Sequence, residues 1–248
     1  MRLAVISDMH GNATAFEEVI RDLKEMSPDA VVCLGDIVMK GPQPVECIDM
    51  VRSLNPLAVV RGNYDDKFLK SPKTPENYKQ ELQLRALRYD SEKISLADQE
   101  WLTQLPHGHT CDLEGIQTEM YHASPQSLYK VTYPWATNEE LEQLHQQEQT
   151  KLVLYGHIHH AYVRYWAGRT IVNCGSIGMP FDRDNRASYA VIDFAGSNLA
   201  VQLRRVEYDI EKALKIAKEL QMPDADAFEY AIKTARYPYN EKKQLPIS

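Results

Sequence analysis

Side chains that commonly bind metal ions follow the end of the first apolar run of the chain. Residues 2–6 are rich in branched side chains and lead into Ser7-Asp8-Met9-His10, which predicts a buried strand followed by a carboxylate and an imidazole. In extended backbone Asp8 and His10 would point to the same side, where they could hold a divalent ion. An isolated Asp-x-His is more often part of a turn, so this interpretation depends on the rest of the chain.

Four more apolar runs, at 30–34, 57–61, 116–122 and 151–155, end in potential ligands. These ligands are Asp36, Asn63, His122, His157 and His159. Glycine stands directly before three of them, at positions 35, 62 and 156. Glycine permits tight turns and close backbone approach. The functional crevice of open α/β folds lies beyond the carboxyl ends of the strands, so we expect these side chains to meet there.

Each of these residues also has an ordinary explanation. Asp36 could cap a helix, Asn63 could belong to a turn, and His122 could be a satisfied histidine at a strand end. The pair His157 and His159 could lie in a surface loop. Together, however, seven carboxylate, imidazole and amide groups exceed the needs of one ion. Such mixed ligands suit manganese, iron, zinc or nickel, and two ions ~3.5–4 Å apart hydrolyse phosphate esters. The set therefore predicts a dinuclear hydrolase site.

Composition narrows the function classes. The 248 residues, 44% hydrophobic and 25% charged, fit an ordinary globular protein, and the net charge of −7 argues against a nucleic-acid polymer as partner. A small phosphate ester remains compatible, because bound cations reverse the local field. Four widely spaced cysteines, no apolar run long enough for a membrane and no room for a signal peptide indicate a cytoplasmic protein. The oligomeric state stays open, a homodimer included.

The order of apolar and polar segments predicts one domain over residues 1–248. The first half has the pattern of parallel strands with helices at 15–26 and 44–54, the first with capping-box spacing at Thr14 and Glu17. A helical excursion at about 65–105 follows. The second half indicates a helix at 138–148 and antiparallel hairpins at 109–122, 161–173 and 188–206. Closing helices are expected within 209–235. A four-layer α/β/β/α sandwich of two mixed sheets fits this order best.

The ordered series of motifs resembles the calcineurin-like metallophosphoesterases, in particular their small bacterial and archaeal phosphodiesterase branch. The motifs are Asp8-x-His10-Gly11-Asn12, Gly35-Asp36, Gly62-Asn63, His122, Gly156-His157-x-His159, and the segment 173–180 followed by 186–189. The resemblance implies the same sandwich. It also implies that Asp8, His10 and His159 hold one ion, that Asn63, His122 and His157 hold the other, and that Asp36 bridges them. Phosphodiesters, or phosphomonoesters, of small nucleotide-type compounds would be hydrolysed by a hydroxide held between the ions.

Tyr64 departs from the family pattern, which usually has histidine after Gly-Asn to help the leaving group depart. Tyrosine has an ordinary pKa of ~10 and is a poor proton donor at neutral pH. Tyr64 is therefore either a weakened catalytic group or a packing residue at the rim, and we expect a preference for good leaving groups. A non-catalytic metal-binding scaffold on the same fold is the alternative function.

Aromatic residues at Tyr129, Tyr133 and Trp135 allow two interpretations. They could stack on the base of a nucleotide, or they could cap the hydrophobic core, which is the interpretation we favour from sequence. The tail aromatics at positions 230, 237 and 239 could likewise cover a neighbouring molecule or the protein's own core.

Overall fold

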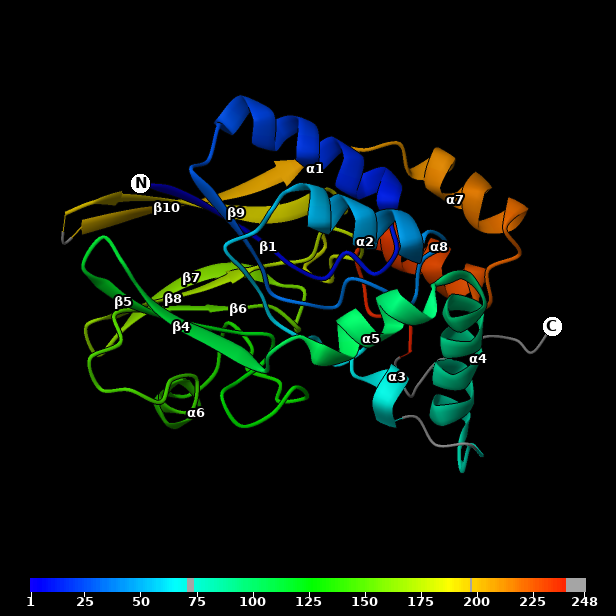
Figure 1. Ribbon diagram of the computed structural model, residues 1–248, viewed down its shortest axis with the longest axis horizontal. Coiled ribbons are helices and arrows are strands. Elements are labelled where there is room, and N and C mark those ends of the chain that lie inside the picture. The colour runs from blue at the N-terminus through cyan, green and yellow to red at the C-terminus, as the bar shows by residue number, and fades with distance from the viewer. Residues whose placement is uncertain (71–73, 197, 240–248) are drawn as a thin grey trace.

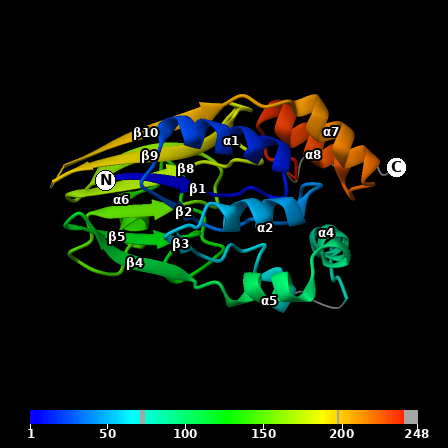
Figure 2. The same ribbon diagram turned by 45° about the horizontal axis from the view of Figure 1, so that its top comes forward.

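Two five-stranded mixed sheets lie face to face in the computed structural model (Figures 1 and 2), which describes residues 1–70, 74–196 and 198–239. The first sheet has the order β10-β9-β1-β2-β3, with β1 (Arg2–Ile6), β2 (Ala30–Cys33), β3 (Ala58–Val59), β9 (Ala187–Ala195) and β10 (Asn198–Val206). The second has the order β4-β5-β6-β8-β7, with β4 (Gly108–Leu113), β5 (Ile116–Tyr121), β6 (Leu152–Tyr155), β7 (Ala161–Trp166) and β8 (Arg169–Cys174).

Strand β1 shows why the inner strands of the first sheet are almost continuously apolar. Leu3 and Val5 point into the core between the two sheets, whereas Ala4 and Ile6 point into the core beneath the helices. Alternation along a strand sends successive side chains to opposite faces, and here both faces are buried.

Helices cover the two outer faces. α1 (Ala13–Met26) and α2 (Pro44–Ser53) cover the first sheet, and α7 (Ile210–Glu219) packs on α1 and on α8 (Ala225–Thr234). α6 (Asn138–Glu142) covers the second sheet through Leu141 and is shorter than the expected 138–148. The predicted four-layer α/β/β/α sandwich is confirmed.

Helix α1 begins earlier than its predicted capping box. Asn12, not Thr14, is the N-cap, since its side chain accepts the Ala15 N–H at 3.2 Å. The Asn12 amide also donates to the Gly178 carbonyl at 2.9 Å, so the cap ties the first motif to the segment that follows β8.

The three predicted antiparallel hairpins are confirmed, since β4 pairs with β5, β7 with β8 and β9 with β10 in antiparallel orientation, but the second sheet is not antiparallel throughout. β5 pairs with β6 in parallel and β6 pairs with β8 in parallel, so that the centre of the second sheet resembles that of the first. The α6 region forms a crossover between β5 and β6, and β7 lies at the edge rather than between its sequence neighbours. The third strand is also shorter than 57–61, because the Arg61 N–H turns away to the Pro106 carbonyl.

The segment of chain between β3 and β4 contains α3 (Lys67–Lys70), α4 (Tyr78–Lys93) and α5 (Leu96–Gln104). Ala86, Leu102 and Leu105 join the core beneath α1 and α2, so this excursion packs on the first sheet's helices. None of the helices that the structure describes is both long and apolar enough to cross a bilayer. The four cysteines are free thiols.

Candidate metal centre

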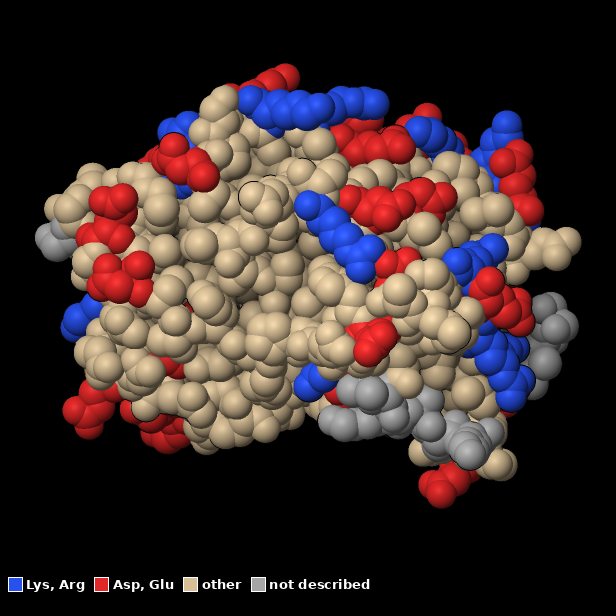
Figure 3. Space-filling view, in the orientation of Figure 1, with Lys and Arg blue, Asp and Glu red and all other residues tan. Residues whose placement is uncertain are grey.

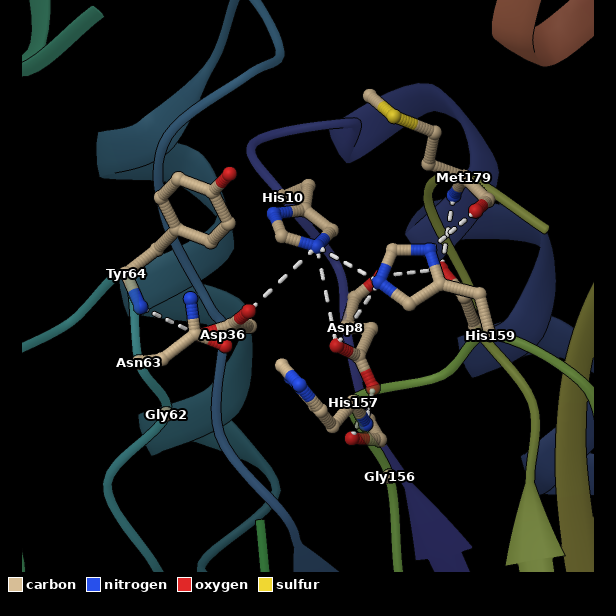
Figure 4. Close-up of polar contacts among 12 residues, drawn as sticks. Asp8, His10, Asp36, Gly62, Asn63, Tyr64, Gly156, His157, His159 and Met179 are labelled. Carbon is tan, nitrogen blue, oxygen red and sulfur yellow. Dashed lines mark hydrogen bonds and ion pairs between the residues drawn. The ribbon is translucent and has the colours of Figure 1, made fainter. Parts of the chain in front are cut away.

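The parallel centres of both sheets point their carboxyl ends to the same place, and the seven predicted ligands lie there; Figure 4 labels all of them except His122. Asp8, Asp36 and Asn63 come from the first sheet, and the histidines after β5 and β6 come from the second. The pairwise contacts are His10 Nε2–His159 Nε2 at 3.1 Å, His159 Nε2–Asp8 Oδ1 at 3.2 Å, His10 Nε2–Asp36 Oδ2 at 3.7 Å, His122 Nε2–Asp36 Oδ2 at 3.4 Å, His122 Nε2–Asn63 Oδ1 at 2.9 Å and His157 Nδ1–His122 Nε2 at 3.2 Å.

The backbone that brings these side chains together is not extended, contrary to the expectation for Asp8 and His10. The left-handed φ angles are 55° for Asp8, 49° for His10, 50° for Asp36, 68° for His157 and 56° for His159. L-residues adopt this region at a cost of roughly 1–2 kcal/mol each. Backbone hydrogen bonds hold the first turn, since the Asp8 N–H donates to Gly35 O and the His10 N–H to Asp36 O, both at 3.0 Å. Such strain is concentrated at functional sites.

The glycines before the ligands are needed for close approach, as predicted. A Cβ on Gly62 would lie 2.1 Å from Asp36 Oδ1, and one on Gly156 would lie 2.2 Å from Ser7 Oγ and 2.7 Å from Asp8 Oδ2. Gly35 has a φ of 89°, and its Cβ would lie 2.3 Å from the Gly62 nitrogen. A side chain at any of these positions would push the ligand loops apart.

The hydrogen bonds of His10 and His159 show that the first cluster fits a cation. His10 Nδ1 lies 3.1 Å from the Met39 carbonyl and His159 Nδ1 lies 2.5 Å from the Met179 carbonyl, so both Nδ1 atoms must carry the proton. Their Nε2 atoms then face each other with lone pairs. Asp8 Oδ1 lies beside them, buried and without a hydrogen-bond donor. Three converging acceptors without a proton between them are the donor set of a metal site.

The second cluster has the same character. His122 Nδ1 lies 2.8 Å from the Leu34 carbonyl, which leaves Nε2 facing the oxygens of Asn63 and Asp36. Burial lowers the pKa of His122, but the Asp36 and Asp8 carboxylates outweigh it and raise the pKa to about 9. Without a metal ion, a proton on His122 therefore supplies the positive charge that these oxygens require.

Burial has the opposite net effect on His10 and His157. It lowers the pKa of each to about 4 despite the nearby carboxylates, so both imidazoles are neutral at pH 7. A neutral imidazole is the form that binds a metal ion.

Asp65 is a residue of the site that the sequence did not single out. It is fully buried and accepts three backbone N–H groups, from Asp36 at 2.9 Å, Ile37 at 3.0 Å and Gly62 at 2.9 Å. Burial and the Asp36 carboxylate raise its pKa to about 7. Asp65 thus fixes the two ligand loops of the first sheet to each other. Its position directly after Gly62-Asn63-Tyr64 was the available signal.

Asp90 on α4 acts on the site from a distance. Its carboxylate accepts the Met39 N–H at 2.7 Å, and the Met39 carbonyl is the acceptor that orients His10. No sequence pattern marked this residue, because it is one of several polar side chains in the last turn of a polar helix. Burial raises the pKa of Asp90 to about 8, although the Met39 N–H and Lys93 oppose the rise.

The raised pKa of Asp90 predicts how the free energy of unfolding depends on pH. The folded state binds the Asp90 proton more tightly than the unfolded state does. The contribution of Asp90 to the free energy of unfolding is therefore fully present below about pH 4 and is lost as the pH rises to about 8. Asp90→Asn keeps an acceptor for Met39 and removes the ionisation. We expect the free energy of unfolding of the variant to gain about 1–3 kcal/mol over the wild type between about pH 5 and about pH 9. Urea titrations of both proteins measure this, and a pH-independent difference would contradict it.

A cavity of about 1260 Å³ opens over the metal centre. Its lining includes His10, Asp36, Asn63, His157 and His159 at the floor, with Lys40, Tyr64, Tyr129, Val131, Tyr133, Trp135, His160, Phe181, Asp182, Arg183, Tyr230, Arg236, Tyr237 and Tyr239 around it. The tail aromatics therefore cover the protein's own cavity.

The interpretation of Tyr129, Tyr133 and Trp135 as a cap on the core is wrong. Their exposed fractions are 49%, 39% and 70%, and all three line the cavity. The loop between β5 and β6 carries them past the edge of the core, which Ala136 and Leu141 close instead.

Comparison with known proteins agrees with this geometry. Residues 1–197 match the calcineurin-like phosphoesterase superfamily domain. An uncharacterised protein of Methanocaldococcus jannaschii is 29% identical over 239 residues, covering 90% of this chain and 94% of its own. The crystal structure of a metallophosphoesterase from Sphaerobacter thermophilus is 26% identical, with a TM-score of 0.73 over 95% of this chain and all of its own.

A hypothetical protein from Pyrococcus horikoshii shares the fold, with a TM-score of 0.78 at 22% identity over 96% of this chain and 98% of its own. The family match covers most of the chain and includes every predicted ligand. The chain belongs to the calcineurin-like phosphoesterase superfamily.

Proposed function

We propose that this protein is a dinuclear metal-dependent phosphodiesterase that acts on small phosphate esters. The observation that carries the proposal is the convergence of buried acceptor atoms, in which the Nε2 lone pairs of His10 and His159 face each other at 3.1 Å beside the donor-free Asp8 Oδ1. A bound cation would satisfy all three groups at once. Membership of the phosphoesterase superfamily supports the reaction class.

In this proposal Asp8, His10 and His159 hold one ion, and Asn63, His122 and His157 hold the second. Asp36 would bridge the two, which its position supports: Asp36 Oδ2 lies 3.7 Å from His10 Nε2 and 3.4 Å from His122 Nε2. Two divalent ions held by these residues, with manganese the first to test, would activate a water molecule at neutral pH and would neutralise the phosphoryl oxygens.

Tyr64 is the nearest side chain that could assist departure of the leaving group. Its ring lies edge-on to His10, with 5.4 Å between ring centroids (Figure 4), and Lys40 Nζ lies 5.4 Å from the Tyr64 centroid. Burial raises the pKa of Tyr64 well above its ordinary value, so the phenol keeps its proton and can donate only a hydrogen bond. Esters whose leaving group departs without a proton, such as aryl phosphates, are therefore expected to react fastest.

The surface charge fits a small substrate better than a nucleic-acid polymer. On the face in Figure 3, basic and acidic side chains alternate over the helices, and the area over the second sheet is mostly uncharged. The net charge is −7. Binding a polyanion requires a continuous basic surface, which this face lacks.

An assay with reconstituted protein tests the proposal. Protein stripped of metal and then loaded with manganese should hydrolyse bis-p-nitrophenyl phosphate faster than p-nitrophenyl phosphate, whereas stripped protein should hydrolyse neither. Metal content is measured on the same samples. Protein that binds two ions per chain and hydrolyses neither ester would overturn the enzyme and establish the metal-binding scaffold instead.

A further inference from the structure

Two aromatic rings stand stacked in the wall of the cavity with a free face. Tyr133 and Trp135 lie parallel, with centroids 4.8 Å apart and an interplanar angle of 12°. His160 meets both rings edge-on, at 5.5 Å from Tyr133 and 6.0 Å from Trp135. We call these three residues the aromatic shelf. Since His160 directly follows His159, the shelf begins one residue from the metal centre.

The shelf does not serve the core. Trp135 is 70% exposed and Tyr133 is 39% exposed, and neither belongs to a hydrophobic cluster of the described residues. A large exposed indole loses hydrophobic stabilisation, so its place at a cavity wall indicates a ligand surface. Planar rings prefer such a surface, because stacking works for any π-face.

Phe181, another aromatic residue in the lining of the cavity, already stacks on a side chain of the metal centre. Phe181 stacks on His159, with centroids 4.3 Å apart and an interplanar angle of 9°, and Tyr237 closes its edge at 5.4 Å. A planar ligand that reaches the metal centre therefore finds its free aromatic face on the shelf and not on Phe181.

The same cavity is lined by two arginine side chains. Arg183 and Arg236 both line it, and the Arg183 N–H donates to the carbonyl of Ala235, which places the two arginines on adjacent segments. Among the residues that the structure describes, neither guanidinium has a hydrogen-bond or ion-pair partner. The nearby Asp182 is paired with Arg205, whose Nη1 donates to Asp182 Oδ1 at 3.2 Å. An anionic group is the ligand that arginine side chains bind most readily.

We propose that the cavity binds a nucleotide, with its base on the aromatic shelf and a further phosphate group at Arg183 and Arg236. This rests on the proposed function only in that the ester linkage would reach the metal centre. It assigns the substrate class: phosphodiesters that carry a nucleobase and at least one additional phosphate. The shelf then acts as a specificity determinant, and small aryl esters would react without using it.

Binding without turnover tests the subsite. Isothermal titration calorimetry with ADP and with inorganic pyrophosphate, both without added metal, separates the base from the phosphates. Stacking on one ring changes affinity by about 5- to 150-fold. We expect Trp135→Ala to weaken ADP binding at least about fivefold more than pyrophosphate binding, and Trp135→Phe to restore most of the loss.

Tyr165→Ala is the matched control. Tyr165 is 71% exposed, as Trp135 is, but it lies on β7 and does not line the cavity. Its substitution should leave the ratio of the two affinities within about twofold of the wild type, inside the scatter of ordinary surface changes. An unchanged ratio in Trp135→Ala would overturn the subsite. So would a dimer that Trp135→Ala dissociates without altering ADP affinity, which would assign the shelf to a second copy of the chain.

Failure here differs from failure of the proposed function. If Trp135→Ala weakens ADP binding more than pyrophosphate binding but the reconstituted protein hydrolyses no ester, the nucleotide subsite stands and the phosphodiesterase activity is overturned. Protein that hydrolyses bis-p-nitrophenyl phosphate but shows no effect of Trp135→Ala on ADP binding keeps the phosphodiesterase and loses the subsite.

Discussion

Asp36→Asn is expected to abolish both hydrolysis and binding of the second metal ion. Asp36 is fully buried and stands between the two histidine clusters, so an amide there removes the negative charge that both ions would share. Metal ions contribute several kcal/mol of transition-state stabilisation, which corresponds to a fall in kcat of at least about 10³-fold. Metal analysis after dialysis and the diester assay measure the two effects on one sample.

The fold should survive this change. Asparagine retains an oxygen that can accept the Tyr64 N–H, which Asp36 Oδ1 accepts at 2.7 Å, and circular dichroism should be that of the wild type. Asp49→Asn, which neutralises an exposed carboxylate on α2, is the control and should keep full activity. Turnover in Asp36→Asn within tenfold of the wild type would mean that the bridging role belongs to another residue.

Tyr64→His is expected to raise activity on esters with poor leaving groups. An imidazole has an ordinary pKa of ~6.5 and is a far stronger acid than the buried phenol, whose pKa is raised. General acid catalysis contributes ~10²–10⁴-fold, so kcat/KM for an alkyl phosphodiester should rise about 10²-fold, with little change for a p-nitrophenyl ester. A series of diesters with leaving groups of increasing pKa measures the change in slope.

Tyr64→Phe distinguishes the two roles that the sequence leaves open for this residue. Loss of one hydrogen bond is worth ~1 kcal/mol, so we expect a fall in kcat of about fivefold or less across the whole ester series. A fall of more than about 10²-fold, steepest for poor leaving groups, would show that the phenol itself donates the proton. An unchanged rate would assign Tyr64 to packing against His10.

The elements that carry the ligands were predictable because their signals are local. Strands β1, β2 and β6 are buried on both faces and therefore read as apolar runs, so a polar residue directly after each run stands out. The glycines at 35, 62 and 156 marked the turns for a reason that the structure bears out, since a Cβ at each would collide with neighbouring backbone or side-chain atoms.

The parallel pairings at the centre of the second sheet were not predicted, because pairing between strands that are distant in the sequence is not a local property. The partner of β6 on one side is β8, although β7 lies between them in the sequence. The sequence predicts five residues for the strand β3, of which only two are paired in the sheet. The apolar run is longer than the strand because Leu57 and Val60, on either side of the paired residues, also hydrogen-bond to β2.

The sequence by itself determined the chemical types at the site and the order in which they arrive, since both follow from residues within a few positions of a strand end. Only the tertiary structure decided how those groups face one another. Five ligand residues have left-handed backbone angles that direct their side chains into the site. Asp65 holds two loops together, and Asp90 orients His10 through Met39. The aromatic shelf was also decided only by the tertiary structure, because whether an aromatic side chain is buried depends on which segments the fold places over it. The local sequence pattern determines the chemistry of the side chains and the alternation of buried and exposed positions. Contacts between distant segments determine the geometry of the site.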